Sequence, residues 1–448
     1  MTPPMNLGEA LAWLDRHQNL ERILGDKRLR APHPDRVRHF AHLMGDPQRS
    51  QPVVHLTGTN GKTSTARALS RLLMAKGLTV GTFTSPHLER INERIMVDLE
   101  PISDVEFAEV LSDLAVLETL SPEGPRLNWF EVMAAAAFRY FSDKPVDVAV
   151  VEVGLGGRWD ATNVADGTVS VVTNVGLDHV ELLGPTRAHI AREKAGIVKP
   201  GSTLVLGEGD SELYEIFAAE QPDRLWWVGR DFAVEANEMA VGGRSLDLRT
   251  PGARYEGLYL RAHGRHQGDN FLDALVAAEA FFDHPIEEDL VAATAAELTT
   301  PGRLEVVQQR PLVLLDGAKN VGGAQASAAA VNEEFGTERP RVMVVGMLRG
   351  KDAREMLEAL EVGKARLVVT CPPLSPRAQP AGMLAEVAAS LGVRAVPTAS
   401  VAEALDVALA EAAPEELVLV TGSLYTVGEA RTAMRARTGE ALGARGMP

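Results

Sequence analysis

The feature that most restricts the fold of this chain is a repeated alternation of short apolar runs with amphipathic segments. Five runs in the first half are rich in β-branched residues: PVVHLTG (52–58), LTVGTFTS (78–85), VDVAVVEVG (146–154), VSVVTNVG (169–176) and STLVLG (202–207). Most show no polar alternation, which is typical of strands covered on both faces of a sheet. Helical patterns separate them, so the sequence predicts an N-terminal α/β domain with a mostly parallel sheet and right-handed crossovers.

A second series of the same kind follows residue 300. Its runs are LVLLDGA (312–318), RVMVVGM (341–347), RLVVTC (366–371), RAVPTA (394–399) and ELVLVTGS (416–423). Each precedes a helical pattern, which predicts a C-terminal Rossmann-like α/β domain of the doubly wound type. Between the two series, Pro301-Gly302 in the segment 298–306 ends the preceding helix and indicates a linker.

The length of the chain also favours two domains. A single core usually stops growing at about 300 residues, and this chain has 448. We therefore expect a phosphate-loop domain over 1–299 and the Rossmann-like domain over 300–448. Within the first, glycine turns between short apolar runs predict a small antiparallel β subdomain near 208–262.

Composition excludes several classes of partner. The formal net charge of −16 argues against a nucleic-acid or anionic-membrane surface, because such surfaces need basic patches. A small anionic ligand remains compatible, since it needs only a few local cations. Cys371 is the only cysteine, which excludes an intrachain disulfide. Neither a signal peptide nor a run of about 18 apolar residues is present, so we expect a cytoplasmic protein.

The stretch VVHLTGTNGKTSTARAL (53–69) suggests a phosphate-binding loop of unusual spacing. A Walker loop would need glycine where Leu56 stands. A strand followed by a glycine turn and a helix from about Lys62 would still direct backbone N–H groups at a phosphate. Lys62 supplies a cation, and Thr63 or Ser64 a hydroxyl for phosphate or Mg²⁺. The alternative is an ordinary turn containing Gly-Lys-Thr by chance. The predicted nucleotide loop comprises Gly58, Thr59, Asn60, Gly61, Lys62, Thr63 and Ser64.

A carboxylate ends one of the buried runs. Glu152 lies near the C-terminal end of its predicted strand, at the edge where α/β sheets bind ligands. Such a buried charge is costly unless it is paired or coordinated to a metal. Gly154, Gly156 and Gly157 allow close backbone approach to a ligand, and Arg158 offers an anion-binding fork. The alternative is a glutamate–arginine ion pair that braces the loop.

The next run ends in a second polar pair. Asp178 and His179 follow their strand and would reach a metal held by Glu152 if the two strands are neighbours. Oxygen ligands with one imidazole suit Mg²⁺ or Mn²⁺. A structural role for His179 is the alternative. Lys194, further along, is by residue type a solvated lysine that pairs with Glu193 or caps a helix.

Eight motifs occur in an order found in one family. They are GTNGKTS, TSPHLERINERI (84–95), FEVMAAAAFRYF (130–141), VVEVGLGGRWDATNV (150–164), GLDHVELLGPTRAHIAREKAGIVKPG (176–201), PGRLEVV (301–307), LLDGAKN (314–320) and VTGSLYTVGEAR (420–431). Through them the chain, from about Gly8 to Arg431, resembles the folylpolyglutamate synthase and dihydrofolate synthase family of the Mur ligase superfamily. The superfamily's phosphate loop is the short form seen here.

The resemblance implies ATP-dependent ligation of L-glutamate to a carboxylate of dihydropteroate or of a folate. ATP phosphorylates the carboxylate, and the amine attacks the acyl phosphate. The tetrahedral intermediate then expels phosphate, which leaves ADP, phosphate and an amide. Metal and Lys62 would stabilise the charge on the transferred phosphoryl group. We expect a monomer that acts on these small molecules.

The resemblance also assigns metal and catalytic residues. Ser85, Glu152 and His179, together with the Thr63 hydroxyl, would be Mg²⁺ ligands, with Mn²⁺ as the alternative and K⁺ as a further candidate cation. Lys194 matches a family lysine that is carbamylated by CO₂. A lysine ammonium, with a pKa of about 10.4, would repel Mg²⁺, whereas its carbamate presents two oxygens. Lys62, Lys194 and His179 are thus the expected catalytic residues.

Other residues are assigned to ATP and to the second substrate by the same resemblance. Asn270, Arg303 and Asp316 match ATP-binding positions, which would place the nucleotide between the domains. The substrate side would comprise Ser85, Phe130, Glu131, Gly156, Gly157 and Arg158. Taken singly, each of these residues has a structural alternative, such as a helix cap or a linker ion pair.

One position departs from the family pattern. The C-terminal motif commonly carries histidine where this chain has Lys319. A lysine can contact phosphate but cannot shuttle a proton as imidazole does. The alternatives to folate ligation are another ligase of the superfamily, a nucleotide-dependent kinase, or a phosphate-loop protein that binds ATP without ligation. The runs EVGLGGRWDATN and REKAGI argue against a cell-wall ligase.

Overall fold

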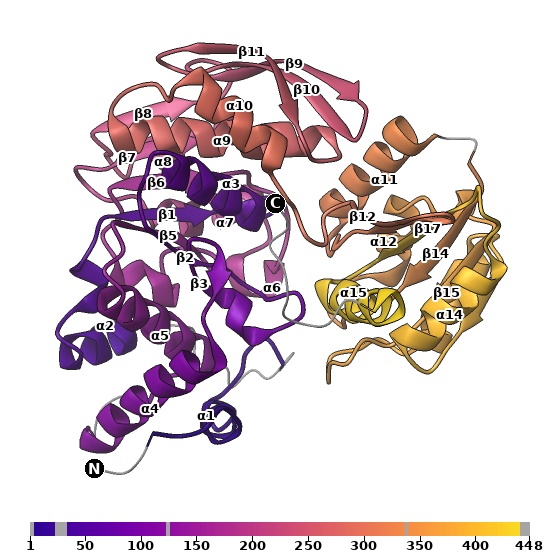
Figure 1. Cartoon of the computed structure of the whole chain (residues 1–448), viewed down its shortest axis with the longest axis horizontal. Coiled ribbons are helices and arrows are strands. Elements are labelled where there is room, and N and C mark those ends of the chain that lie inside the picture. Colours follow the sequence, from indigo (N-terminus) through magenta and orange to yellow (C-terminus); the bar gives the residue numbers. More distant parts are fainter. Residues whose placement is uncertain (1–3, 23–33, 122–125, 337–338, 440–448) are drawn as a thin grey trace.

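The computed structural model describes residues 4–22, 34–121, 126–336 and 339–439. Two layered α/β halves lie beside each other, and the chain passes between them after α10 (Glu288–Glu297), as Figure 1 shows. Among the described residues, no helix is long and apolar enough to cross a membrane.

An eight-stranded sheet forms the centre of the first half, in the order β4-β3-β2-β5-β1-β6-β7-β8. Its strands are β1 (Val53–Thr57), β2 (Val80–Phe83), β3 (Ile95–Val97), β4 (Glu100–Pro101), β5 (Val148–Glu152), β6 (Val169–Val172), β7 (Thr203–Leu206) and β8 (Arg224–Trp227). The pairs from β2 to β8 are parallel, whereas β3 and β4 pair antiparallel at one edge. The five predicted runs form the buried strands β1, β2, β5, β6 and β7, so the mostly parallel sheet is confirmed.

Both faces of this sheet are covered, which explains why its strands lack polar alternation. On β5, Val148 and Val150 pack in one core with α3 (Lys62–Ala75) and α9 (Arg265–Phe282). Ala149 and Val151 point the other way, into a core with α4 (Asp104–Leu120) and α5 (Trp129–Asp143). Because successive side chains of a strand alternate between faces, two cores require an unbroken apolar run.

Further helices complete the first half. α1 (Leu7–Leu14) and α2 (Pro34–Leu43) join the α4–α5 layer. α7 (Arg187–Ala195) and α8 (Ser211–Ala218) pack over the ends of β6 and β7 in a smaller core. The short α6 (Val180–Leu183) follows the segment after β6.

A three-stranded antiparallel sheet lies over α9, at the top of Figure 1. It consists of β9 (Ala233–Ala240), β10 (Gly243–Arg249) and β11 (Arg254–Leu260). This sheet begins later than the range 208–262 predicted from sequence. Residues 211–227 instead form α8 and β8, and β8 pairs in parallel with β7 and extends the first sheet.

The second half has a six-stranded sheet in the order β12-β13-β17-β14-β15-β16. Its elements are β12 (Glu305–Gln309), β13 (Leu312–Leu315), α11 (Val321–Phe335), β14 (Arg341–Val345), α12 (Ala353–Ala359), β15 (Leu367–Thr370), α13 (Ala381–Ser390), β16 (Ala395–Pro397), α14 (Val401–Glu411), β17 (Leu417–Thr421) and α15 (Leu424–Thr438). The strands from β13 to β16 are parallel, which confirms the Rossmann-like prediction. The end of the expected linker, however, belongs to β12, an edge strand antiparallel to β13.

Charged side chains join the two halves at a distance from the sheet ends. Arg244 of β10 has a fully buried side chain, and its guanidinium pairs with Glu334 of α11 at 2.6 Å. His263 and the Gly264 N–H also bond to Glu334, both at 2.7 Å. On another side, Glu89 bonds to Arg431 of α15. We propose the division between the two domains at 299/300, on the arrangement of the three sheets.

Replacement of Arg244 tests how much this junction stabilises the protein. Arg244→Met should lower the free energy of unfolding by about 3 kcal/mol, because it leaves the buried Glu334 carboxylate without its guanidinium partner. Urea unfolding followed by circular dichroism measures the change. The matched control is Arg265→Gln, which removes a largely exposed pair with the neighbouring Glu333 and should change little. Equal losses in both variants would contradict the assignment.

Candidate active site

The turn between β1 and α3 has the geometry expected of a phosphate loop. Gly61 is the residue before α3 and has φ +85°, a left-handed value that favours glycine. A Cβ at Gly61 would fall far inside contact distance of the Asn270 amide oxygen. Asn270, predicted to bind ATP, therefore lies against this loop from α9. The first turn of α3 then presents N–H groups that the helix itself leaves unbonded.

The same loop is fixed to the end of β6. The Asn60 N–H donates to the Asn174 side chain at 3.0 Å. The Asn60 carbonyl accepts hydrogen bonds from Thr173 Oγ1 at 2.6 Å and from Asn174 Nδ2 at 3.0 Å. Thr59 bonds through its hydroxyl to Gly176. The backbone around Asn60 is thus held in one conformation, while Lys62 Nζ donates to the Gly58 carbonyl at 2.9 Å.

Glu152 is a buried carboxylate beside this loop. It is 1% exposed and accepts hydrogen bonds from Thr63 Oγ1, at 2.9 Å, and from the Ser85 N–H, at 3.2 Å. Burial raises its pKa, although Lys62 and these two hydrogen bonds oppose the shift. Within the described residues, Glu152 forms no ion pair. Three predicted site residues from separate segments, Thr63, Ser85 and Glu152, therefore meet here.

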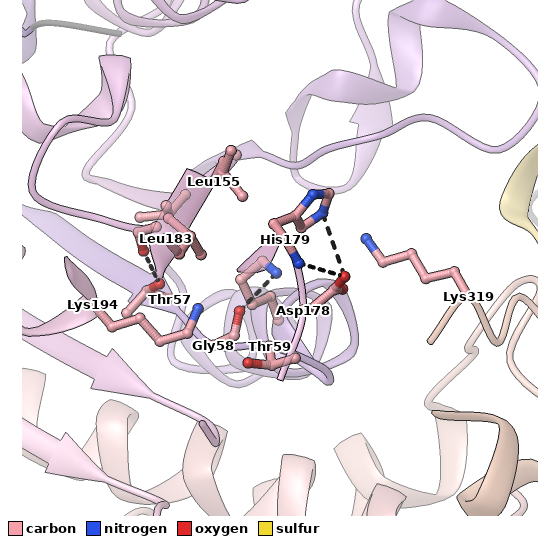
Figure 2. Close-up of a pocket in the computed structure, with 13 residues that line it drawn as sticks. Thr57, Gly58, Thr59, Leu155, Asp178, His179, Leu183, Lys194 and Lys319 are labelled. Atoms are coloured by element: carbon pink, nitrogen blue, oxygen red, sulfur yellow. Dashed lines mark hydrogen bonds and ion pairs between the residues drawn. The ribbon is translucent and has the colours of Figure 1, made fainter. Parts of the chain in front are cut away.

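A pocket opens between the loop and the segment after β6, shown in Figure 2. Its lining residues are Thr57, Gly58, Thr59, Lys62, Val153, Gly154, Leu155, Gly156, Asp178, His179, Leu183, Lys194 and Lys319. Lys319 extends into it from the second half, with its ammonium toward Asp178 and His179. The pocket thus combines groups from both halves, and its lysines outnumber its carboxylates.

Burial and mutual repulsion change the acidity of these groups. Burial lowers the Lys194 pKa well below its usual range, and Lys62 lowers it further. Burial and Lys62 also lower the pKa of Lys319, to about 8. For His179, burial lowers the pKa to about 4 against the opposing effect of Asp178. Near neutral pH, His179 is therefore an uncharged imidazole, the form that can coordinate a metal.

Lys194 is not the solvated lysine that its residue type suggested. It is 3% exposed and lies near the end of α7, in the pocket wall rather than on a solvated surface. A buried lysine with a lowered pKa has a substantial neutral fraction, and the neutral amine is the nucleophilic form.

The predicted metal ligands are not preassembled as a cluster. Across the described ranges, no three His, Cys, Asp or Glu side chains gather at metal-binding separation, and no hydrogen bond or ion pair joins His179 to Glu152. The donors near Glu152 nevertheless fit Mg²⁺, because a carboxylate without an ion pair lies beside the Thr63 hydroxyl. The metal assignment itself stays a prediction.

Of the predicted ATP residues of the second half, Arg303 lies near the Glu152 carboxylate and Asp316 lies near Arg303. Asp316, at the end of β13, accepts hydrogen bonds from the Leu304 N–H at 3.1 Å and the Ala318 N–H at 3.2 Å. Burial lowers the pKa of Arg303. The nearby negative charges of Asp316 and Glu152 oppose this shift, but the effect of burial is larger. Arg303 therefore lies between the halves, and its role in ATP binding stays a prediction.

Apart from Ser85, which contacts Glu152, the predicted substrate residues divide into two groups. Phe130 packs on Gly154, where an added Cβ would lie 2.7 Å from its Cε1. Gly156 lines the pocket, and Gly157 packs against the end of α7, since a Cβ there would lie 2.7 Å from the Glu193 carbonyl. These three border the pocket.

The other two make structural contacts outside it. Glu131 is buried, pairs with Arg36 at 2.6 Å, and caps α5 by accepting a bond from the Asn128 N–H at 2.7 Å. Arg158 pairs at the surface with Glu220 of the segment after α8. Its partner is therefore not Glu152, as the ion-pair alternative would suggest. For both residues a substrate role stays a prediction.

Comparison with known proteins identifies the family. The family described as Mur ligase middle domain matches residues 56–278, and the one described as Mur ligase, glutamate ligase domain, matches residues 302–424. The dihydrofolate synthase/folylpolyglutamate synthase of Mycobacterium tuberculosis is 40% identical over 438 residues, which cover 90% of each chain. The chain belongs to the folylpolyglutamate synthase and dihydrofolate synthase family. Another relative in this family, the folylpolyglutamate synthase of Lacticaseibacillus casei, is 33% identical over 439 residues, covering 95% of this chain and 98% of its own.

Solved structures of the family have the same fold. Folylpolyglutamate synthase of Mycobacterium tuberculosis complexed with ADP and AMPPCP superposes with a TM-score of 0.87 at 38% identity, covering 96% of this chain and 98% of that one. FolC of E. coli in complex with DHPP and ADP gives a TM-score of 0.85 at 30% identity, covering 98% and 100%. Both structures are complexes with adenine nucleotides: ADP and AMPPCP in the first, and ADP in the second.

Gly61 provides a direct test of the loop. Gly61→Ala should weaken ADP binding by at least about tenfold, because the new Cβ both strains φ and collides with Asn270. Isothermal titration calorimetry with ADP measures the dissociation constant. Gly77→Ala is the matched control, since Gly77 has the same φ of +85° with no atom within 4 Å. Unchanged ADP affinity in Gly61→Ala would contradict this function of the loop.

Proposed function

We propose that this family member uses ATP to join L-glutamate to a carboxylate of dihydropteroate or of a folate, with release of ADP and phosphate. The observation that carries the proposal is the pocket itself, where a phosphate loop and lysines from both halves converge, with the buried Glu152 carboxylate beside the loop. In a chain of this family, that combination supports phosphoryl transfer followed by amide formation.

The first step transfers the γ-phosphoryl group of ATP to the substrate carboxylate. Lys62 would leave the Gly58 carbonyl and contact the phosphate oxygens, together with the N–H groups of the first turn of α3. Lys319, which extends into the pocket from the second half, would add a second cation. Asn270, Arg303 and Asp316 would position the nucleotide. Positive charge fixed around the moving group lowers the barrier, since charge is redistributed in the transition state.

The second step forms the amide. The amine nitrogen of L-glutamate attacks the carbonyl carbon of the acyl phosphate and loses a proton, and the bond from that carbon to the phosphate oxygen then breaks. Phosphate leaves with the bonding electrons, and the lysines of the pocket stabilise its charge. Leu155, Leu183 and Phe130 would exclude water from the acyl phosphate beside Gly156.

A divalent cation fits beside the loop. Glu152, Thr63, Ser85 and His179 would hold Mg²⁺, with Mn²⁺ as the alternative, and K⁺ remains a further candidate. When bound, such a cation supplies positive charge to the phosphate oxygens of ATP. The residues themselves prepare the site, because the Thr63 hydroxyl and the Ser85 N–H already orient the Glu152 carboxylate.

Lys194 would act as a carbamate. Its neutral amine would add to CO₂ with loss of one proton, and the side chain would become an anion with two carbamate oxygens. Lys62 and Lys319 would attract this anion, whereas they would repel the ammonium form of Lys194. The lowered pKa of Lys194, caused chiefly by burial, favours the neutral amine that this addition needs.

The test is phosphate release from ATP with L-glutamate, offering dihydropteroate or tetrahydrofolate in turn. We expect release that requires both the pteridine acid and glutamate, with product mass increased by one glutamyl residue. Lys194→Ala should reduce the rate by at least about 100-fold. The wild type should also slow in CO₂-depleted buffer and recover with bicarbonate, whereas Lys194→Ala should not respond.

Lys199→Ala is the control for Lys194. Lys199 is nearby in sequence but bonds to Asn163 at 2.8 Å outside the pocket, and its replacement should leave the CO₂ response intact. A stable phosphorylated product without amide would indicate a kinase. ATP binding without turnover on either pteridine acid would rule out the proposed ligation.

A further inference from the structure

A polar network links the phosphate loop directly to the second half. The Asn60 and Asn320 side-chain amides, 260 positions apart, exchange two hydrogen bonds. Asn60 Nδ2 donates to Asn320 Oδ1 at 3.3 Å, and Asn320 Nδ2 donates to Asn60 Oδ1 at 3.0 Å. Two primary amides are complementary in this arrangement, because each offers one donor and one acceptor.

The network extends to the segment that carries His179. Asn320 Nδ2 also donates to Asp178 Oδ2 at 3.0 Å. The other oxygen of Asp178 pairs with Lys351, which follows β14 in the second half, and accepts the His179 N–H at 2.9 Å. Two donors from the second half therefore hold one carboxylate of the first.

The Asp178 carboxylate is well suited to bind these two donors of the second half. Asp178 is 8% exposed, so its contacts with Asn320 and Lys351 are screened little by solvent. Asp178 thus receives a donor from the second half on each of its carboxylate oxygens.

Asn60 connects this polar network to the backbone of the phosphate loop. The Asn60 backbone is bound to Thr173 and Asn174 of the first half, so its side chain is the part free to contact the second half. The loop is therefore held from both sides. Any separation of the halves would break the amide pair and release one of these two supports.

We infer that Asn320 and Lys351 are positioning residues for the ligation, which hold the phosphate loop and the Asp178–His179 segment in the arrangement that the pocket requires. This inference rests on the proposed function for its kinetic consequences. Neither residue needs to touch the reacting atoms. Their loss should reduce kcat by about 10- to 100-fold, since small misplacements of reacting groups have effects of this size. ADP binding should change by less than about threefold, because neither Asn320 nor Lys351 is among the residues proposed to contact the nucleotide.

The variants separate positioning from stability. Asn320 also caps α11, because its Oδ1 accepts the Gly323 N–H at 2.8 Å. Asn320→Ser keeps a capping oxygen but loses the amide donor to Asn60 and Asp178. Asn320→Asp keeps the cap and places a second carboxylate against Asp178. Lys351→Met removes the charge at similar length, and Lys351→Arg restores it.

Arg265→Gln provides the matched control at the other junction. It removes a contact between the halves, to Glu333, that does not involve the phosphate loop. Full-length protein would be assayed for kcat, for KM with ATP, for ADP affinity and for the melting temperature. We expect reduced kcat in Asn320→Ser, Asn320→Asp and Lys351→Met, recovery to within about threefold in Lys351→Arg, and wild-type kcat in Arg265→Gln.

A second measurement is independent of the reaction. Hydrogen–deuterium exchange without substrates should show faster exchange of peptides covering residues 57–63 and 174–180 in Asn320→Ser and Lys351→Met than in the wild type or Arg265→Gln. Unchanged exchange in both segments would overturn the inference even if the enzyme is a ligase. Faster exchange in a protein that forms no amide would support the positioning role while the proposed function fails. Wild-type kcat in Asn320→Asp, or a kcat loss shared by Arg265→Gln, would also overturn it.

Discussion

Repulsion among lysines around one pocket is the constraint on which the rest of the site depends. Lys194 is buried, and Lys62 and Lys319 line the same pocket. Among the described residues that line this pocket, Asp178 is the only carboxylate. Bringing cations together away from water is costly unless an anion joins them. The protein as a whole has a net charge of −16, so this local excess of positive charge marks a site for a polyanion.

Elements from both halves of the protein hold the residues of this site in place. β1, β5 and β6 are adjacent parallel strands, so the loop after β1, Glu152 at the end of β5 and the segment after β6 meet at one sheet edge. Buried strands with a core on each face fix those ends firmly. The second half contributes Lys319, Asn320 and Lys351 to the same edge. The site is thus complete only where the two sheets face each other.

Much of the fold could be predicted because its signals are local. Apolar runs without alternation identified the buried strands, and the Gly-Thr-Asn-Gly-Lys-Thr turn identified the loop. The proximity of Thr63, Ser85 and Glu152 was also predictable, through the family resemblance. By contrast, β8 and β12 were missed: β8 is only partly buried at the edge of its sheet, and β12 follows a Pro-Gly pair that indicated a linker.

Long-range contacts could not be predicted in this way. Glu131 pairs with Arg36 and Arg158 with Glu220, and no spacing in the sequence encodes either partner. The Asn60–Asn320 pair was equally hidden, although both residues lie in motifs that the sequence analysis identified. Lys351 had no local signal at all. Its position depends on how the two halves pack, and side chains that do not line the pocket, such as Arg244 and Glu334, contribute to that packing.

The most direct test of this account is a crystal structure of the full chain with Mg²⁺ and a non-hydrolysable ATP analogue. The account predicts the β- and γ-phosphates within hydrogen-bond distance of both Lys62 and Lys319, with Asn60 and Asn320 still paired. A nucleotide bound elsewhere, or phosphates in contact with the first half alone while Lys319 faces solvent, would contradict the claim that the two halves share one polyanion site.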